Sequence, residues 1–198
     1  MSGITIDLIK QLRDRTQASF ADCKNVLEET NGDLEEAAKQ LRVRGAAIAE
    51  KRGDREANAG IVDAYIHSNG KLGVLLDLRT ETDFVAKTEE FRALAHDIAL
   101  HIAAAAPRYI RADEIPDTDR EDEKRLIMQQ FAESGKPANV VEKIVEGKLA
   151  SLAKDICLLE QAFVKDQGKT VQNVLDEAVA KFGEKVTVAR FARMQVGE

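Results

Sequence analysis

The sequence contains no tryptophan, only two cysteines and only three prolines, and aromatic residues make up 5% of its 198 positions. Two cysteines as far apart as Cys23 and Cys157 argue against a disulfide framework and a thiolate zinc site, and a reducing compartment is expected. Both are interpreted as small buried hydrophobic side chains, with an intermolecular bridge as the alternative. No signal-peptide pattern opens the chain, and no apolar run approaches the ~20 residues of a membrane helix. We therefore expect a soluble, cytoplasmic protein that does not bind membranes.

A surplus of positive charge is also missing. The 29 lysines and arginines are outnumbered by 35 acidic residues, which gives a net charge of -6. Proteins that bind nucleic acids or anionic membranes usually carry a basic surplus that displaces counterions. The composition, 44% hydrophobic and 32% charged, is that of an ordinary globular protein. These values argue against direct binding to nucleic acid.

Catalytic and metal-binding patterns are scarce as well. The histidines His67, His96 and His101 have no metal-like partner at a fixed spacing, and the last two lie about 140° apart on a helix. His101 falls at the edge of an apolar stripe and is interpreted as a satisfied boundary histidine. Gly168-Lys169-Thr170 resembles the end of a phosphate loop, but Phe163 stands where that pattern needs glycine, so a loop ending in a helix cap is favoured. We expect no enzyme activity, no cofactor and no bound metal.

Residues 4–45 show the pattern of three short amphipathic helices. Ser19 and Asp33 are predicted as N-caps of the second and third helices, and Gly45 as the end of the third. Such helices form a small bundle around one shared core. Residues 46–59 are charged and lack a wide apolar face, which predicts a partly helical linker.

From residue 60 the periodicity changes to that of β-strands. Residues 61–66 and 72–78 flank an Asn-Gly pair, which tolerates the positive φ of a tight turn and predicts a hairpin. A third strand is predicted over 185–196, with the apolar residues Val186, Val188, Met194 and Val196 at even spacing, to complete a three-stranded antiparallel sheet. Helices are predicted over 88–106, 119–134, 138–154 and 170–182. The fold class is therefore α+β, with a core domain over 60–198 that packs helices on one small sheet.

One loop stands out after the second strand, at Thr80 to Lys87. Thr82 can cap a helical turn, which leaves Asp83 and Phe84 in its first turn. In one interpretation Phe84 projects beside the carboxylate. In the other it is a core side chain and Asp83 only marks the helix start, since large aromatics are usually buried.

The run Thr82-Asp83-Phe84-Val85-Ala86-Lys87 resembles the signature of the bacterial elongation factor Ts family, and it follows a strand as that family's signature does. Further resemblances run in order along nearly the whole chain, at Leu12-Arg13-Asp14-Arg15-Thr16, Asp22-Cys23-Lys24, Asn31-Gly32-Asp33, Ser134-Gly135-Lys136-Pro137, Val145-Glu146-Gly147-Lys148 and Gly168-Lys169-Thr170-Val171. Any one of these motifs is weak, but their shared order is highly specific. The chain departs from the family at Gln17, where a glycine is usual, and keeps only Phe20 of an apolar pair.

The resemblance implies a ubiquitin-associated-like three-helix domain, a linker, and a core of sheet and helices. It also implies a partner, elongation factor Tu, bound in its GDP and nucleotide-free forms, whose GDP is exchanged for GTP. In this family the stretch matching Thr82, Asp83, Phe84 and Val85 displaces the partner's Mg²⁺. Asp83 and Phe84 are then the working residues, and Thr82 and Val85 hold the turn.

Short members of the family form homodimers, and the longer members' second core half and helical protrusion are expected to be absent here. Phe20 on the N-terminal domain is a further candidate contact with the partner. Leu72, Gly73 and His101 are weaker candidates, contributed by the second subunit. Two other functions remain open: an adaptor that binds a partner without exchange, and an acid–base enzyme, for which no general base is visible.

Overall fold

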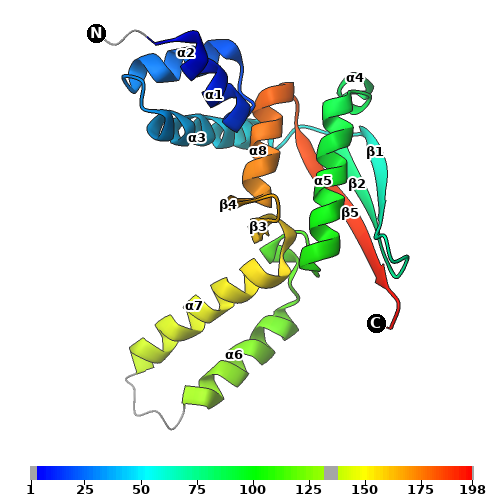
Figure 1. Ribbon diagram of the computed structural model, residues 1–198. Helices are drawn as coiled ribbons and strands as arrows, with labels where there is room; N and C mark the ends of the chain where they lie inside the picture. Colours follow the sequence, from blue (N-terminus) through cyan, green and yellow to red (C-terminus); the bar gives the residue numbers. More distant parts are fainter. Residues whose placement is uncertain (1–3, 132–137, 198) are drawn as a thin grey trace.

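The computed structural model describes residues 4–131 and 138–197. Three parts follow one another in space: an N-terminal helical bundle, a sheet covered by helices, and a projecting pair of helices (Figure 1). The predicted α+β class, with N-terminal helices followed by a three-stranded antiparallel sheet packed with helices, is confirmed. Within the described residues, no helix combines the length and the apolar character needed to cross a bilayer.

The N-terminal bundle consists of α1 (Ile6–Thr16), α2 (Phe20–Glu29) and α3 (Leu34–Arg52). The predicted caps are confirmed: the side chain of Ser19 accepts a hydrogen bond from the backbone N–H of Asp22, and that of Asp33 from two N–H groups of α3. Each cap satisfies donors that the first helical turn leaves unpaired. The bundle core is Ile9, Leu12, Cys23, Val26, Leu27, Ala37 and Leu41.

Helix α3 does not end at Gly45 as predicted, but continues to Arg52, so half of the predicted linker is helical. Gly45 is buried against α8 (Val171–Phe182), where an added Cβ would lie 3.6 Å from the carbonyl oxygen of Asp176 and 3.8 Å from the Cβ of Ala180. Both separations are ordinary van der Waals contacts, so α3 continues through Gly45 and packs on α8 without requiring a residue that lacks a side chain. Residues 53–58 connect α3 to the sheet. The division into two domains stays a prediction.

The sheet contains β1 (Ala59–Ile66), β2 (Leu72–Thr80) and β5 (Val186–Gln195), antiparallel and in the order β1-β2-β5. The predicted hairpin is confirmed, and Gly70 in its turn has a φ of +66°. Helix α5 (Glu89–Ala105) packs across one face of the sheet. This core includes Val74, Leu76, Leu78, Phe91, Ala95, Ile98, Ile102, Leu175, Val179, Val186 and Val188.

A β-bulge in β5 changes which side chains face the core. Asp77 of β2 pairs with Arg190 and Leu78 with Val188, which leaves Ala189 as an extra residue. One inserted residue reverses the alternation of a strand. Met194 and Val196 are therefore exposed, although their even spacing would place them on the same face as the buried Val186 and Val188 in a strand without a bulge.

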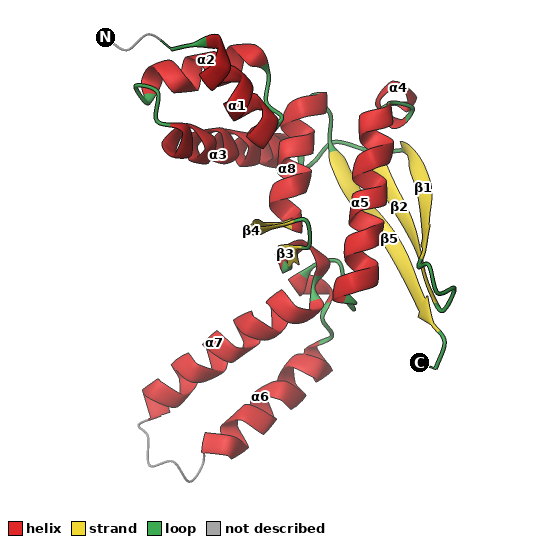
Figure 2. Ribbon diagram, viewed as in Figure 1, coloured by secondary structure: helices red, strands yellow, loops and turns green. Residues whose placement is uncertain are grey.

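Among the residues that the structure describes, no helix covers the other face of the sheet (Figure 2). Its exposed side chains include Val62, Ala64, Ile66, Leu75, Ala192 and Met194. A bare apolar face of this kind is typical of a surface that another protein covers.

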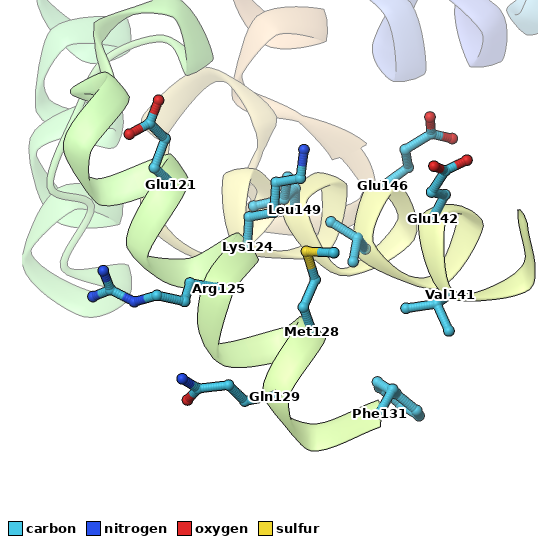
Figure 3. A pocket seen from close by; sticks show the side chains of 11 residues that line it. Glu121, Lys124, Arg125, Met128, Gln129, Phe131, Val141, Glu142, Glu146 and Leu149 are labelled. Carbon is cyan, nitrogen blue, oxygen red and sulfur yellow. The ribbon is translucent and has the colours of Figure 1, made fainter. Parts of the chain in front are cut away.

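Helices α6 (Asp117–Phe131) and α7 (Ala138–Ile156) form a hairpin that projects from the core (Figure 1). The expectation that the chain lacks a helical protrusion is therefore wrong. A groove of about 880 Å³ runs between them, and Met128 and Leu149 lie along it in Figure 3. The predicted turn at Ser134-Gly135-Lys136-Pro137 lies outside the described residues.

The segment after α7 contains elements that the sequence did not indicate. A single turn of 3-10 helix occupies Leu158–Glu160, and a short hairpin, β3 (Ala162–Phe163) and β4 (Asp166–Thr170), precedes α8. Another such turn, Ala112–Glu114, lies before α6. Both cysteines are free and fully buried, as the interpretation of them as small hydrophobic side chains requires.

Candidate functional site

The loop after β2 forms a single isolated helical turn, α4 (Asp83–Ala86). Thr82 is its N-cap, and the Thr82 hydroxyl oxygen accepts from the backbone N–H of Val85 at 3.5 Å, as predicted. Thr88 then caps α5 by accepting from the N–H of Phe91 at 3.2 Å. Thr82 thus begins α4, and Thr88 begins α5 only two residues after α4 ends. The turn is therefore a separate short helix at the end of the sheet (Figure 1).

The turn divides its side chains between core and solvent. Val85 and Ala86 are buried in the core of the sheet domain. Asp83 is exposed, and the Phe84 side chain is 83% exposed, the largest fraction among the large hydrophobic residues that the structure describes. The interpretation of Phe84 as a core side chain is therefore wrong. An exposed phenylalanine beside a carboxylate, on an anchored turn, is an unsatisfied apolar surface that a partner can bury.

Two carboxylates under the turn were not identified from the sequence. Glu184, between α8 and β5, accepts from the hydroxyl of Thr80 at 2.9 Å, the backbone N–H of Thr82 at 3.0 Å and the hydroxyl of Thr82 at 2.7 Å. Glu81 accepts from the backbone N–H of Lys185 at 2.7 Å. We call Glu81 and Glu184 the carboxylate brace.

The electrostatics of Glu81 follow from these contacts. The hydrogen bond from the N–H of Lys185 lowers the pKa of Glu81, and the guanidinium groups of Arg55 and Arg52, 3.2 and 3.4 Å away, lower it further against an opposing effect of burial. Glu81 therefore stays ionised at neutral pH and ties the end of α3 to the loop.

The remaining candidate contacts do not gather around Phe84. Phe20 is 46% exposed on the N-terminal bundle, where a partner can reach it. Leu72 and Gly73 begin β2, and Thr80, next to the turn, ends it. They therefore lie at opposite ends of the sheet, so one chain does not present them as a single surface with Phe84.

His101 is fully buried, not at a boundary as predicted. Its Nδ1 accepts from the backbone N–H of Val164 at 3.2 Å, so its Nε2 carries the proton and donates to Gln161 at 3.0 Å. Burial lowers the pKa of His101, and the bond to Gln161 offsets only part of that effect. The imidazole is a satisfied core group in this chain, and a contact of His101 with a partner stays a prediction.

The structure also accounts for the phosphate-loop resemblance. Gly168-Lys169-Thr170 lies on β4 rather than in a loop, and Thr170 caps α8 as predicted. The Lys169 ammonium pairs with Glu177 at 2.7 Å. Between residues 4 and 131 and from 138 to 197, no group of three or more histidine, cysteine, aspartate or glutamate side chains is placed to hold a metal ion.

Comparison with known proteins assigns the family. The family model described as "Elongation factor TS" matches residues 5–198. The chain is 50% identical over 195 residues to elongation factor Ts of Fervidobacterium nodosum, covering 98% of this chain and 99% of that protein. Identity to elongation factor Ts of Carboxydothermus hydrogenoformans is 49%, over 98% of this chain and 90% of the relative, and to that of Thermosipho melanesiensis 48%, over 98% and 100%. The turn, its exposed phenylalanine and these matches agree: the chain belongs to the elongation factor Ts family of translation elongation factors.

Proposed function

We propose that the chain binds elongation factor Tu·GDP and promotes the release of GDP, so that GTP can take its place. The observation that carries the proposal is the exposed Phe84 beside Asp83 on an anchored turn, in a chain of this family. No catalytic side chain is needed, because exchange makes and breaks no covalent bond. The chain acts only through the free energy of binding.

A wedge is the physical mechanism that these residues support. GDP held at nanomolar affinity is bound by ~12 kcal/mol, and direct competition would need a ligand that resembles the nucleotide. In a GTPase the Mg²⁺ and the phosphate loop share the binding of the nucleotide, so displacing one weakens the rest. Inserted near that site, the Phe84 ring displaces a partner segment and disturbs the metal shell, and the Asp83 carboxylate repels the phosphates.

The N-terminal bundle supplies the second part of the interface. The Lys169 ammonium donates to the carbonyl oxygen of Arg15 in α1 at 3.4 Å and to Glu177 of α8 at 2.7 Å, which adds to the packing of α3 on α8. The N-terminal bundle is thus attached to the domain that carries the turn, so Phe20 and Phe84 can contact the same partner. A broad interface gives more binding free energy to set against that of the nucleotide, and by linkage GDP weakens factor binding by the same amount.

We also propose that the chain forms a homodimer through the bare face of the sheet. That face carries apolar side chains of all three strands, with Leu75, 54% exposed, at its centre. A two-fold axis brings identical faces together, as in a sandwich of two sheets. The second subunit then brings its own Leu72 and Gly73 to the assembly.

The test is the release of fluorescent GDP from purified elongation factor Tu after mixing with excess unlabelled nucleotide. Acceleration by substoichiometric amounts of the chain is expected, because a factor that is released after each exchange turns over many times. Binding without acceleration would support the adaptor function instead. No binding and no acceleration would exclude both.

A further inference from the structure

The turn that presents Phe84 is too short to be stable by itself. It contains four residues, Asp83–Ala86. In a single helical turn, the entropy lost by fixing the backbone angles exceeds the stabilisation from its few hydrogen bonds. Burial of Val85 and Ala86 anchors one side of it. The direction of the exposed side therefore depends on the hydrogen bonds at its N-cap.

The N-cap is fixed by Glu184. A carboxylate only accepts hydrogen bonds, so the hydroxyl proton of Thr82 points to Glu184 at 2.7 Å, and the lone pairs of that oxygen remain for the N–H of Val85. The other oxygen of Glu184 holds the backbone N–H of Thr82 at 3.0 Å. Both the side chain and the backbone of the cap are thereby set before any partner arrives.

The other half of the carboxylate brace reaches the N-terminal bundle. Glu81 accepts from the N–H of Lys185, while the Lys185 ammonium donates to the carbonyl oxygens of Gly53 at 2.6 Å and Arg55 at 2.8 Å, just after α3. The loop 183–185 therefore contacts both the turn and the end of α3.

We infer that Glu184 is a positioning residue for nucleotide exchange: it holds Thr82 so that Phe84 meets the partner already ordered. The inference rests on the proposed function. A side chain that is ordered in advance loses less freedom on binding, so the benefit falls on the step in which Phe84 inserts.

The experiment measures GDP release from elongation factor Tu against factor concentration, to separate the maximal rate from the half-saturating concentration. Glu184→Ala is expected to lower the maximal rate about fivefold to tenfold, with less than about a twofold change in half-saturation, because only the placement of an inserted group is lost. Glu146→Ala, on the projecting α7, is the matched control and should match the wild type. An unchanged maximal rate in Glu184→Ala would overturn the inference.

A double-mutant cycle separates positioning from general stability. In a Phe84→Ala background, Glu184→Ala should cost less than about a twofold further loss, since the group it positions is gone. Losses that multiply would overturn the inference while leaving the proposed function intact. No effect of Phe84→Ala alone would instead remove the proposed function, and the inference with it.

Variants of Thr82 keep the test decisive if Glu184→Ala folds poorly. Thr82→Ser retains the hydroxyl that joins Glu184 to Val85 and should keep the wild-type maximal rate, whereas Thr82→Ala should reproduce the loss. Equal activities of the two variants would refute the role of this hydrogen bond. Melting curves, recorded by circular dichroism, set an assay temperature at which every variant is folded.

Discussion

Replacing Phe84 by alanine removes the exposed ring and leaves the framework unchanged. The side chain is 83% exposed, so it adds little to the folded state. Surface substitutions of this kind usually change the free energy of unfolding by less than about 0.5 kcal/mol. The variant should therefore fold normally, and any loss of exchange can be assigned to the missing ring.

The size of the loss follows from the surface that the ring would bury on the partner. Fully burying a phenylalanine side chain contributes about 1.5–3 kcal/mol. Since about 1.4 kcal/mol corresponds to a factor of ten in rate, Phe84→Ala should slow factor-stimulated GDP release by about tenfold to a hundredfold.

The assay is stopped-flow release of fluorescent GDP from elongation factor Tu at saturating factor. Phe84→Leu serves as a partial replacement and should fall between wild type and Phe84→Ala, because it restores apolar volume without the flat ring. A loss of less than about twofold in a folded Phe84→Ala variant, far below the range that burial predicts, would refute the wedge.

Three further predictions concern other residues. Asp83→Ala should reduce GDP release less than Phe84→Ala does, and the deficit should shrink at low Mg²⁺ because a group that acts on the metal becomes redundant; an equal deficit at all Mg²⁺ concentrations would contradict this. Leu75→Lys places a charge at the centre of the bare sheet face and should convert dimer to monomer in sedimentation equilibrium, whereas a wild type that is already monomeric would exclude the dimer. The folded chain holds His101 neutral with a lowered pKa, while the unfolded chain takes up a proton near the ordinary value of 6.5, so the free energy of unfolding should fall as pH drops below about 6.5. In His101→Gln, urea unfolding at pH 7.5 and 5.0 should show a smaller difference than in wild type.

Local chemistry in the sequence was enough to predict the caps, the hairpin and the turn. Ser19, Asp33, Thr82 and Thr170 each cap a helix as predicted, because the side chain of a cap bonds to backbone only two or three residues away. Such signals need no knowledge of the rest of the fold. The anchored turn that carries Phe84 was predictable for this reason.

Features set by distant contacts were not predictable. Glycine often ends a helix, but α3 continues past Gly45 to Arg52 and packs against α8 there. The bulge at Ala189 is a matter of pairing with β2, so even spacing in the sequence would place Met194 on the wrong face. His101 lies on an apolar stripe whose edge is covered by a segment about 60 residues away.

The carboxylate brace shows the same limit at the functional site. Glu184 and Thr82 are separated by 102 positions in the chain. Nothing in the residues around Glu184 distinguishes it from other glutamates after a helix. The three hydrogen bonds that Glu184 accepts can be identified only once the pairing of the strands is known.

The central claim is that Phe84 enters the nucleotide region of elongation factor Tu, and photocrosslinking from position 84 tests it most directly. The variant Phe84→p-benzoylphenylalanine, mixed with nucleotide-free elongation factor Tu and irradiated, should crosslink to the domain that holds the nucleotide, and excess GDP with Mg²⁺ should suppress the product. The same group in place of Asn69, in the turn at the other end of the sheet, is the control and should give little product. Equal crosslinking from both positions, or a product from position 84 that maps outside the nucleotide-binding domain, would contradict the account.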